Sequence, residues 1–81
     1  MKAEKRALRN LAQHLRELRL GKGWSQDKLA EYVDSDRTYI SDIERGLRNP
    51  SIKMVARLAY TLGAKIGDLC DWELIDSQHI L

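Results

Sequence analysis

Two short helical segments joined by a very short polar turn constrain the fold of this chain more than any other feature. The first segment lies within 25–33, three polar residues follow at 34–36, and the second segment runs over about 37–45. Two helices with so short a connection cross steeply instead of lying antiparallel. The first helix then supports the second, and we expect the second helix to keep its outer face and N-terminus exposed.

Length and composition favour one small soluble domain. With 81 residues, 43% of them hydrophobic and 32% charged, the chain suits a single domain over 1–81 with a thin core. Cys70 is the one cysteine, so neither an internal disulfide nor a cysteine-based zinc site is expected. The sequence contains neither a secretory leader nor an 18-residue apolar run. We therefore expect a cytoplasmic protein without a membrane segment, metal, cofactor or effector-binding domain.

The charges are divided unevenly along the chain. All 14 Lys and Arg lie in 1–65 together with eight of the 12 acids, whereas 66–81 holds four acids and no base. That gives about +6 for the first part and about −4 for the second. The division favours a basic working surface and a separate role for the C-terminal segment, although a solvated surface with an acidic tail has about equal weight on charge alone.

Apolar residues recur at helical spacing in the flanking segments as well. The expected stripe of the first helix is Leu8, Leu11, Ala12, Leu15 and Leu18. The expected core face of the fourth helix is Ile52, Val55, Leu58, Ala59 and Leu62. A short last helix is expected over 66–70, and no segment alternates as a strand would. The predicted fold is all-α, a compact bundle of five short helices.

Helix starts and stops support the same division. Ser25, Asp36 and Ser51 precede the second, third and fourth helices and are good N-cap residues. Gly46 and Gly63 follow the third and fourth helices, where the chain often takes a left-handed conformation that glycine accepts best. The capping pattern thus places the short polar turn between two separately capped helices.

Three separated blocks resemble the Cro/repressor-type helix-turn-helix family, also called the XRE family. The blocks are Trp-Ser-Gln-Asp-Lys-Leu-Ala at 24–30, Asp-Arg-Thr-Tyr-Ile-Ser-Asp-Ile-Glu-Arg-Gly-Leu-Arg-Asn-Pro-Ser at 36–51 and Leu-Ala-Tyr-Thr-Leu-Gly at 58–63. The resemblance covers about 8–70, and within the family it looks most like the controller proteins of restriction-modification systems. It implies a lambda-repressor-like fold and a regulator of transcription that binds double-stranded DNA.

The resemblance also implies a role for individual positions. Residues that contact bases would be Arg37, Thr38 and Asp42, with Ser41 close by. Residues that contact the DNA backbone would be Gln26, Tyr39, Arg45, Arg48 and Asn49. Arg19 and Glu44 match a pair that forms an internal salt bridge in related repressors. Simpler roles compete at two positions: Arg37 as a solvated helix charge, and Tyr39 as a cover for the edge of the core.

The chain departs from the family pattern at a few positions. Asp34 and Ser35 replace the usual glycine and apolar residue after the second helix, which still allows the turn because aspartate tolerates a left-handed backbone. Lys65 replaces the usual cap of the last helix, so we expect a ragged start there. Asp42 would have to accept from a cytosine amino group or lie away from the phosphates.

The C-terminal segment is the expected dimer interface. The apolar residues that would form it are Ile66, Leu69, Cys70, Trp72 and Ile75, within 66–81. A module this small offers few contacts for tight specific binding as a monomer, which favours a homodimer on a pseudo-palindromic operator. The competing possibility is that this segment folds back on its own core.

The sequence does not support an enzyme, because it has neither a nucleophile beside a base nor a glycine-rich phosphate loop. The expected function is a sequence-specific DNA-binding transcriptional regulator. The alternative is an antitoxin-like interaction module, whose main partner is another protein and whose acidic, apolar C-terminal segment covers a toxin.

Overall fold

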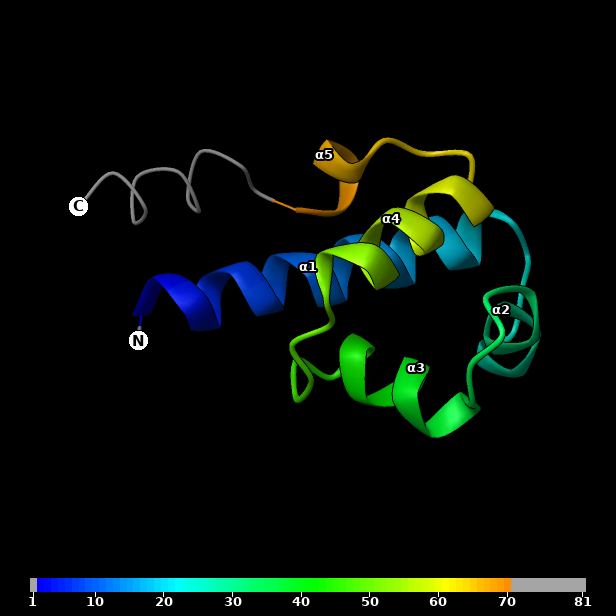
Figure 1. Cartoon of the computed structure of the whole chain (residues 1–81), viewed down its shortest axis with the longest axis horizontal. Coiled ribbons are helices and arrows are strands. Elements are labelled where there is room, and N and C mark those ends of the chain that lie inside the picture. Colours follow the sequence, from blue (N-terminus) through cyan, green and yellow to red (C-terminus); the bar gives the residue numbers. More distant parts are fainter. Residues whose placement is uncertain (1, 71–81) are drawn as a thin grey trace.

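The computed structural model describes residues 2–70 and contains five helices within them (Figure 1). They are α1 (Lys2–Gly21), α2 (Gln26–Tyr32), α3 (Arg37–Glu44), α4 (Ile52–Thr61) and α5 (Ile66–Leu69). No strand occurs between residues 2 and 70. The predicted all-α bundle of five helices is confirmed.

Local hydrogen bonds explain where α2, α3 and α4 begin. The side chains of Ser25, Asp36 and Ser51 each accept from the backbone N–H three residues later, at 3.0, 2.8 and 3.1 Å. Each bond satisfies one of the N–H groups that a helix start leaves without a partner. Gly46 ends α3 with φ of +72°, a conformation that costs a residue with a side chain more than glycine.

The start of α5 is better defined than expected. The carboxylate of Asp68 accepts from the backbone N–H of Lys65 at 2.8 Å, as the third helical residue does in a capping box. The expected ragged start at Lys65 is therefore wrong, because the stabilising side chain comes from inside the helix rather than from the cap position.

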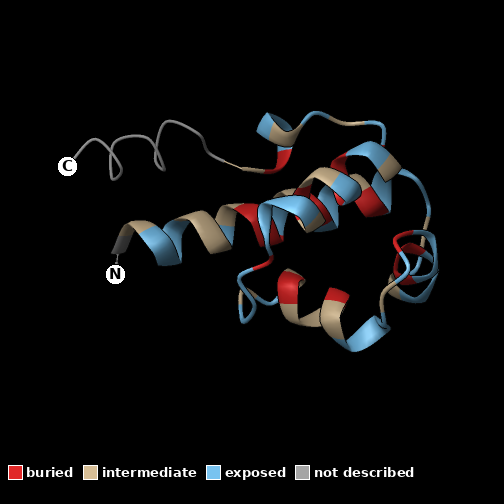
Figure 2. Cartoon of the chain, in the orientation of Figure 1, coloured by how far each residue is buried: buried red, intermediate tan, exposed pale blue. Residues whose placement is uncertain are grey.

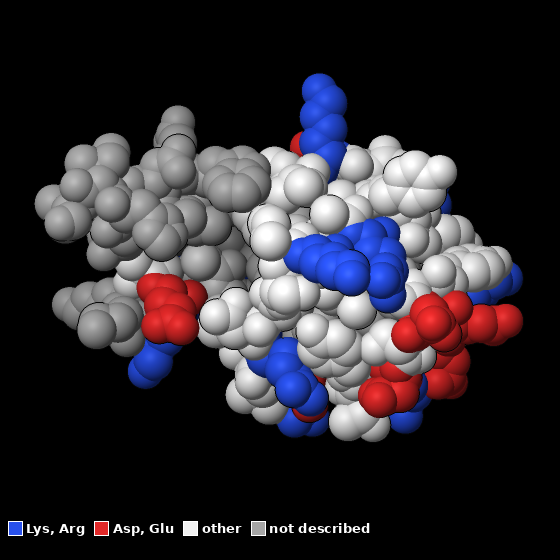
Figure 3. Space-filling view, in the orientation of Figure 1, with Lys and Arg blue, Asp and Glu red and all other residues white. Residues whose placement is uncertain are grey.

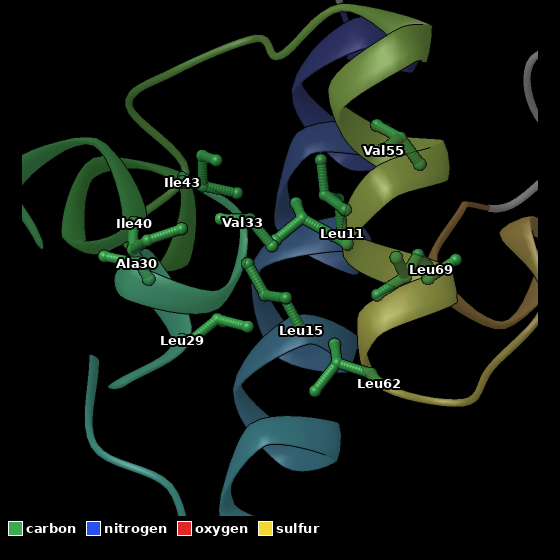
Figure 4. Packing of buried hydrophobic residues seen from close by; sticks show 12 residues of the cluster. Leu11, Leu15, Leu29, Ala30, Val33, Ile40, Ile43, Val55, Leu62 and Leu69 are labelled. Carbon is green, nitrogen blue, oxygen red and sulfur yellow. The ribbon is translucent and has the colours of Figure 1, made fainter. Parts of the chain in front are cut away.

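One continuous apolar core joins all five helices (Figure 4). Its members are Leu11, Leu15, Leu29, Ala30, Val33, Ile40, Ile43, Val55, Leu58, Ala59, Leu62 and Leu69. The expected place of Ile52 in this core is wrong, since this residue is 60% exposed. Ile52 is the first residue of α4, where the helix extends beyond the edge of the core, and Met54 packs against the core instead.

The packing leaves one side of α3 open. Helix α3 packs against α1 and α2, whereas α5 packs against α1 and α4. In Figure 1, α3 lies on one side of α1 and α5 on the other, while α4 crosses over α1 in this view. The buried residues of α3 face the bundle, and its N-terminal turn is exposed (Figure 2). An exposed helix N-terminus on a packed helix is the arrangement that the short turn predicts.

Candidate nucleic-acid interface

The turn between α2 and α3 is closed by backbone hydrogen bonds. Asp34 has φ of +56°, its N–H donates to the carbonyl of Glu31 at 3.2 Å, and the N–H of Ser35 donates to the carbonyl of Ala30 at 2.8 Å. Aspartate is one of the few residues with a side chain that take this left-handed conformation readily. The two departures from the family pattern thus preserve the turn, as expected.

The turn is also held from outside the two helices. Arg57 of α4 donates from Nη1 to the carbonyl of Val33, the C-cap of α2, at 3.2 Å. This contact joins residues 24 positions apart. Sequence reasoning missed it, because no local pattern shows which arginine reaches a helix end from another element.

The four predicted base-contacting residues lie on two turns of α3. Arg37 and Thr38 are exposed in the first turn, and Ser41 and Asp42 are half-buried one turn later. The carboxylate of Asp42 lies 3.7 Å from Nη2 of Arg45. That neighbouring positive charge partly neutralises the carboxylate.

The predicted backbone-contacting residues fall into two groups. Arg45, Arg48 and Asn49 are exposed at the C-terminal end of α3 and in the following loop, and the Arg48 guanidinium lies 4.8 Å from the centre of the Tyr39 ring. Tyr39 also packs against the core, which is the simpler of the two roles considered for it. Gln26 differs, because its Nε2 donates to Glu44 within the chain at 3.1 Å.

Arg19 and Glu44 fix α3 to α1. Arg19 donates from Nε and Nη2 to the two carboxylate oxygens of Glu44, at 2.6 and 2.9 Å, and from Nη1 to the carbonyl of Trp24 at 2.7 Å. Their side chains are 9% and 4% exposed. The hydrogen bond to Glu44 raises the pKa of Arg19 above its ordinary value, against the opposing effect of burial. This planar pair sets the position of α3 on the bundle.

Acidic side chains gather at one end of this face. Figure 3 shows carboxylates gathered over α2 and the turn to α3, where Asp27, Glu31, Asp34 and Asp36 are exposed. Arg37 lies at this acidic end, and its Nε is 3.8 Å from Oδ1 of Asp27. Asp27 is not among the site residues predicted from the sequence. Spacing along the sequence gives no signal for it, because its proximity to Arg37 depends on how α2 and α3 cross.

The predicted dimer residues are placed less favourably. Leu69 is completely buried in the core of its own chain, so its expected role as a dimer contact is wrong: α5 turns it inward onto α1 and α4. Ile66 and Cys70 are half-buried and pack against the same core, and burial raises the pKa of the Cys70 thiol. Trp72 and Ile75 lie outside the described residues.

Neither a metal site nor a membrane-spanning helix occurs in the described part of the chain. Within residues 2–70, no group of three or more His, Cys, Asp or Glu side chains is arranged to hold a metal ion. None of the helices in that part is both long and apolar enough to span a membrane.

Residues 15–69, which include the whole α2–turn–α3 unit, match the helix-turn-helix family. The chain belongs to this family. The control protein C.BamHI of Bacillus amyloliquefaciens is 47% identical over 64 residues, which cover 78% of this chain and 79% of that protein. The chain is therefore a helix-turn-helix transcription regulator related to restriction-modification controller proteins, and these regulators are not enzymes.

Solved helix-turn-helix structures agree with the fold. The restriction-modification controller protein C.AhdI of Aeromonas hydrophila superposes with a TM-score of 0.75 at 40% identity, covering 80% of this chain and 94% of that one. The controller protein C.Esp1396I, solved as a tetramer in complex with its natural 35 base-pair operator, gives 0.70 at 34% identity over 86% and 91% of the two chains. The family resemblance inferred from the sequence is confirmed.

Proposed function

We propose that this chain is a controller-type regulator that binds a specific double-stranded DNA operator as a homodimer, with α3 in the major groove. The observation that carries the proposal is the exposed N-terminal turn of α3, whose Arg37 and Thr38 project from a helix that Arg19 and Glu44 fix to the bundle. An α-helix fits the major groove of B-DNA, where side chains can distinguish all four base pairs.

The base contacts would come from the outer face of α3. Arg37 is suited to donate in a bidentate manner to O6 and N7 of a guanine, and Thr38 and Ser41 can hydrogen-bond to several bases. Asp42 would accept from a cytosine amino group or remain with Arg45. Because a buried ion pair fixes α3, the backbone from which these side chains project has a defined position.

The backbone contacts would flank the base contacts. Arg45, Arg48 and Asn49, at the C-terminal end of α3 and beyond it, would bind phosphates and set the register of the helix. Tyr39 would add its hydroxyl, and Gln26 would use the parts of its amide that Glu44 leaves free. Phosphate contacts carry no base preference, so they provide affinity and Arg37 provides selectivity.

Assembly as a homodimer is supported by the relatives and by the size of the domain. C.Esp1396I is a tetramer on its operator. We propose that residues 1–81 form one domain and that the segment 66–81, through Ile66, Cys70, Trp72 and Ile75, joins two copies. Such a regulator works where DNA is accessible, which supports a cytoplasmic location.

A binding experiment tests this function directly. The protein is used to select duplexes from a random DNA library, and fluorescence anisotropy then measures affinity for the selected duplex and for a scrambled duplex at several salt concentrations. Two phosphate-binding arginines in each of two subunits give a slope of about −4 in a plot of log K against log salt. Failure to select any sequence would contradict the proposal, and tight, salt-independent binding to a protein would favour the antitoxin-like alternative.

A further inference from the structure

Asp27 and Arg37 form an ion pair between the first turns of α2 and α3. Oδ1 of Asp27 lies 3.8 Å from Nε of Arg37, and the two side chains are 75% and 66% exposed. A pair this long and this exposed adds little to folding stability. Asp36, which is next to Arg37, already uses its carboxylate to cap α3. The pair between Asp27 and Arg37 therefore has a better explanation in binding than in folding.

The geometry of the pair leaves the useful end of Arg37 free. A guanidinium presents its donors as a rigid planar fork. Asp27 approaches the Nε side, so the two terminal nitrogens remain available for a bidentate contact. That contact is the one by which arginine recognises O6 and N7 of guanine. A carboxylate on the Nε side would also restrict a long, flexible side chain before DNA arrives, which reduces the entropy lost on binding.

The negative charge of Asp27 also lowers the affinity for any DNA. The first turn of α2 would approach the DNA backbone in the proposed complex, where a carboxylate is repelled by phosphates. On DNA that offers a guanine, Arg37 binds the base and Asp27 supports its orientation. On DNA without that guanine, the same repulsion remains and no base contact offsets it, so the difference between the two DNAs comes from the guanine contact that Asp27 positions.

We infer that Asp27 is a positioning residue that sets the preference of Arg37 for guanine and disfavours DNA lacking that base. The inference rests on the proposed function, since it concerns selectivity at the same interface. Asp27 itself contacts no base in this arrangement. It acts through the guanidinium of Arg37, so its effect must disappear when Arg37 is removed.

The test uses the full chain and a duplex that the native protein selects from a random library. Guanines of each half-site are changed singly to adenine. The relevant guanine is the one whose change weakens binding by the native protein but does not weaken binding by the Arg37→Ala variant. The measured quantity is the ratio of the affinities for the selected duplex and for this changed duplex. Asp27→Asn is expected to lower that ratio by about fivefold in the dimer, and Asp27→Glu to restore most of it. In an Arg37→Ala background, Asp27→Asn should leave the ratio unchanged.

Glu31→Gln is the matched control. Glu31 is an exposed acid of the same short helix, and it makes no ion pair with any Lys or Arg between residues 2 and 70. Its change removes the same charge, so both affinities should rise together and the ratio should stay as in the native protein. Equal ratios for Asp27→Asn and the native protein, or equal losses in Asp27→Asn and Glu31→Gln, would overturn the inference alone. A native protein that selects no sequence would overturn the proposed function together with it.

Discussion

The guanidinium of Arg19 and the carboxylate of Glu44 meet edge to edge across 25 positions of sequence, with donor–acceptor distances of 2.6 and 2.9 Å. The same guanidinium also donates to the carbonyl of Trp24, and Gln26 donates to Glu44. One buried group of side chains thus joins the end of α1, the start of α2 and the end of α3. The position of the candidate DNA-contacting helix depends on this group.

Glu44→Ala should therefore affect folding more than recognition. The change leaves the guanidinium of Arg19 buried with two fewer acceptors, and breaking a buried pair in this way costs about 3–5 kcal/mol of the free energy of unfolding. Urea denaturation followed by circular dichroism measures the loss. Glu17→Ala, which removes an exposed acid of α1, is the control and should change the free energy by less than about 0.5 kcal/mol. A native-like midpoint for Glu44→Ala would show that the pair contributes nothing to stability.

Arg37→Ala and Arg48→Ala should separate base contacts from phosphate contacts. Loss of a bidentate contact to guanine costs about 1–3 kcal/mol on a selected duplex and much less on a scrambled one. Arg48→Ala should weaken both duplexes alike and make the salt dependence shallower. Anisotropy titrations at three salt concentrations provide the comparison. Equal losses for Arg37→Ala on both duplexes would make Arg37 a backbone contact.

The features that depend on neighbouring residues could be predicted from the sequence. The caps at Ser25, Asp36 and Ser51 and the left-handed turn at Asp34 each involve groups within a few positions of one another. Ile52 shows where periodicity fails: it lies in register with the buried face of α4, but the core does not reach the first residue of that helix. Apolar periodicity predicts which face of a helix is buried, but it does not predict how far along the helix the core extends.

The contacts that set the site depend on tertiary packing. The pairing of Asp27 with Arg37 and the contact from Arg57 to the α2 terminus require the positions of separate helices, which spacing alone does not provide. Leu69 illustrates the same limit, since an apolar residue near a C-terminus is compatible with an interface or with the core. Only the path of α5 distinguishes the two.

Leu69→Ala should destabilise the monomer fold itself. Leu69 is fully buried, and truncating a buried leucine costs about 2–5 kcal/mol because it leaves a cavity. In a domain of this size, each kcal/mol lowers the melting temperature by about 4–8 °C. Ile52→Ala provides the control, since its exposed side chain predicts a melting temperature close to native. Equal melting temperatures for the two variants would contradict the placement of α5 on the core.

Cys70 should make stability depend on pH in the alkaline range. Burial raises the pKa of its thiol above the ordinary value of 9.0, so the folded chain holds the proton more strongly than the unfolded chain does. The resulting stabilisation is complete below pH 9 and is lost as the pH rises through the folded-state pKa. The free energy of unfolding should thus fall less between pH 8 and about 10 in Cys70→Ala than in the native chain. At pH 8.5, iodoacetamide should likewise label the Cys70 thiol of the native chain more slowly than the thiol of the urea-unfolded chain. Equal labelling rates would contradict the burial of Cys70.

The assembly prediction concerns the segment that follows α5. The described chain ends at Cys70 beside α1, where the ring Nδ1 of His14 lies 3.4 Å from the carbonyl oxygen of Leu69. Trp72→Glu adds a negative charge to 66–81, a segment with four acids and no Lys or Arg, so no base of that segment can pair with it. Sedimentation at micromolar concentration should show a dimer for the native chain and a folded monomer for Trp72→Glu, with affinity for the selected duplex lost in parallel. Half-sites should lie roughly 10–11 base pairs apart, because the two copies of α3 must be about 34 Å apart to enter successive major grooves.

Ile52→Glu is the control for Trp72→Glu and should remain dimeric. Loss of the dimer in that variant but not in Trp72→Glu would place the interface on α4, and a native chain that stays monomeric both free and on DNA would contradict the homodimer.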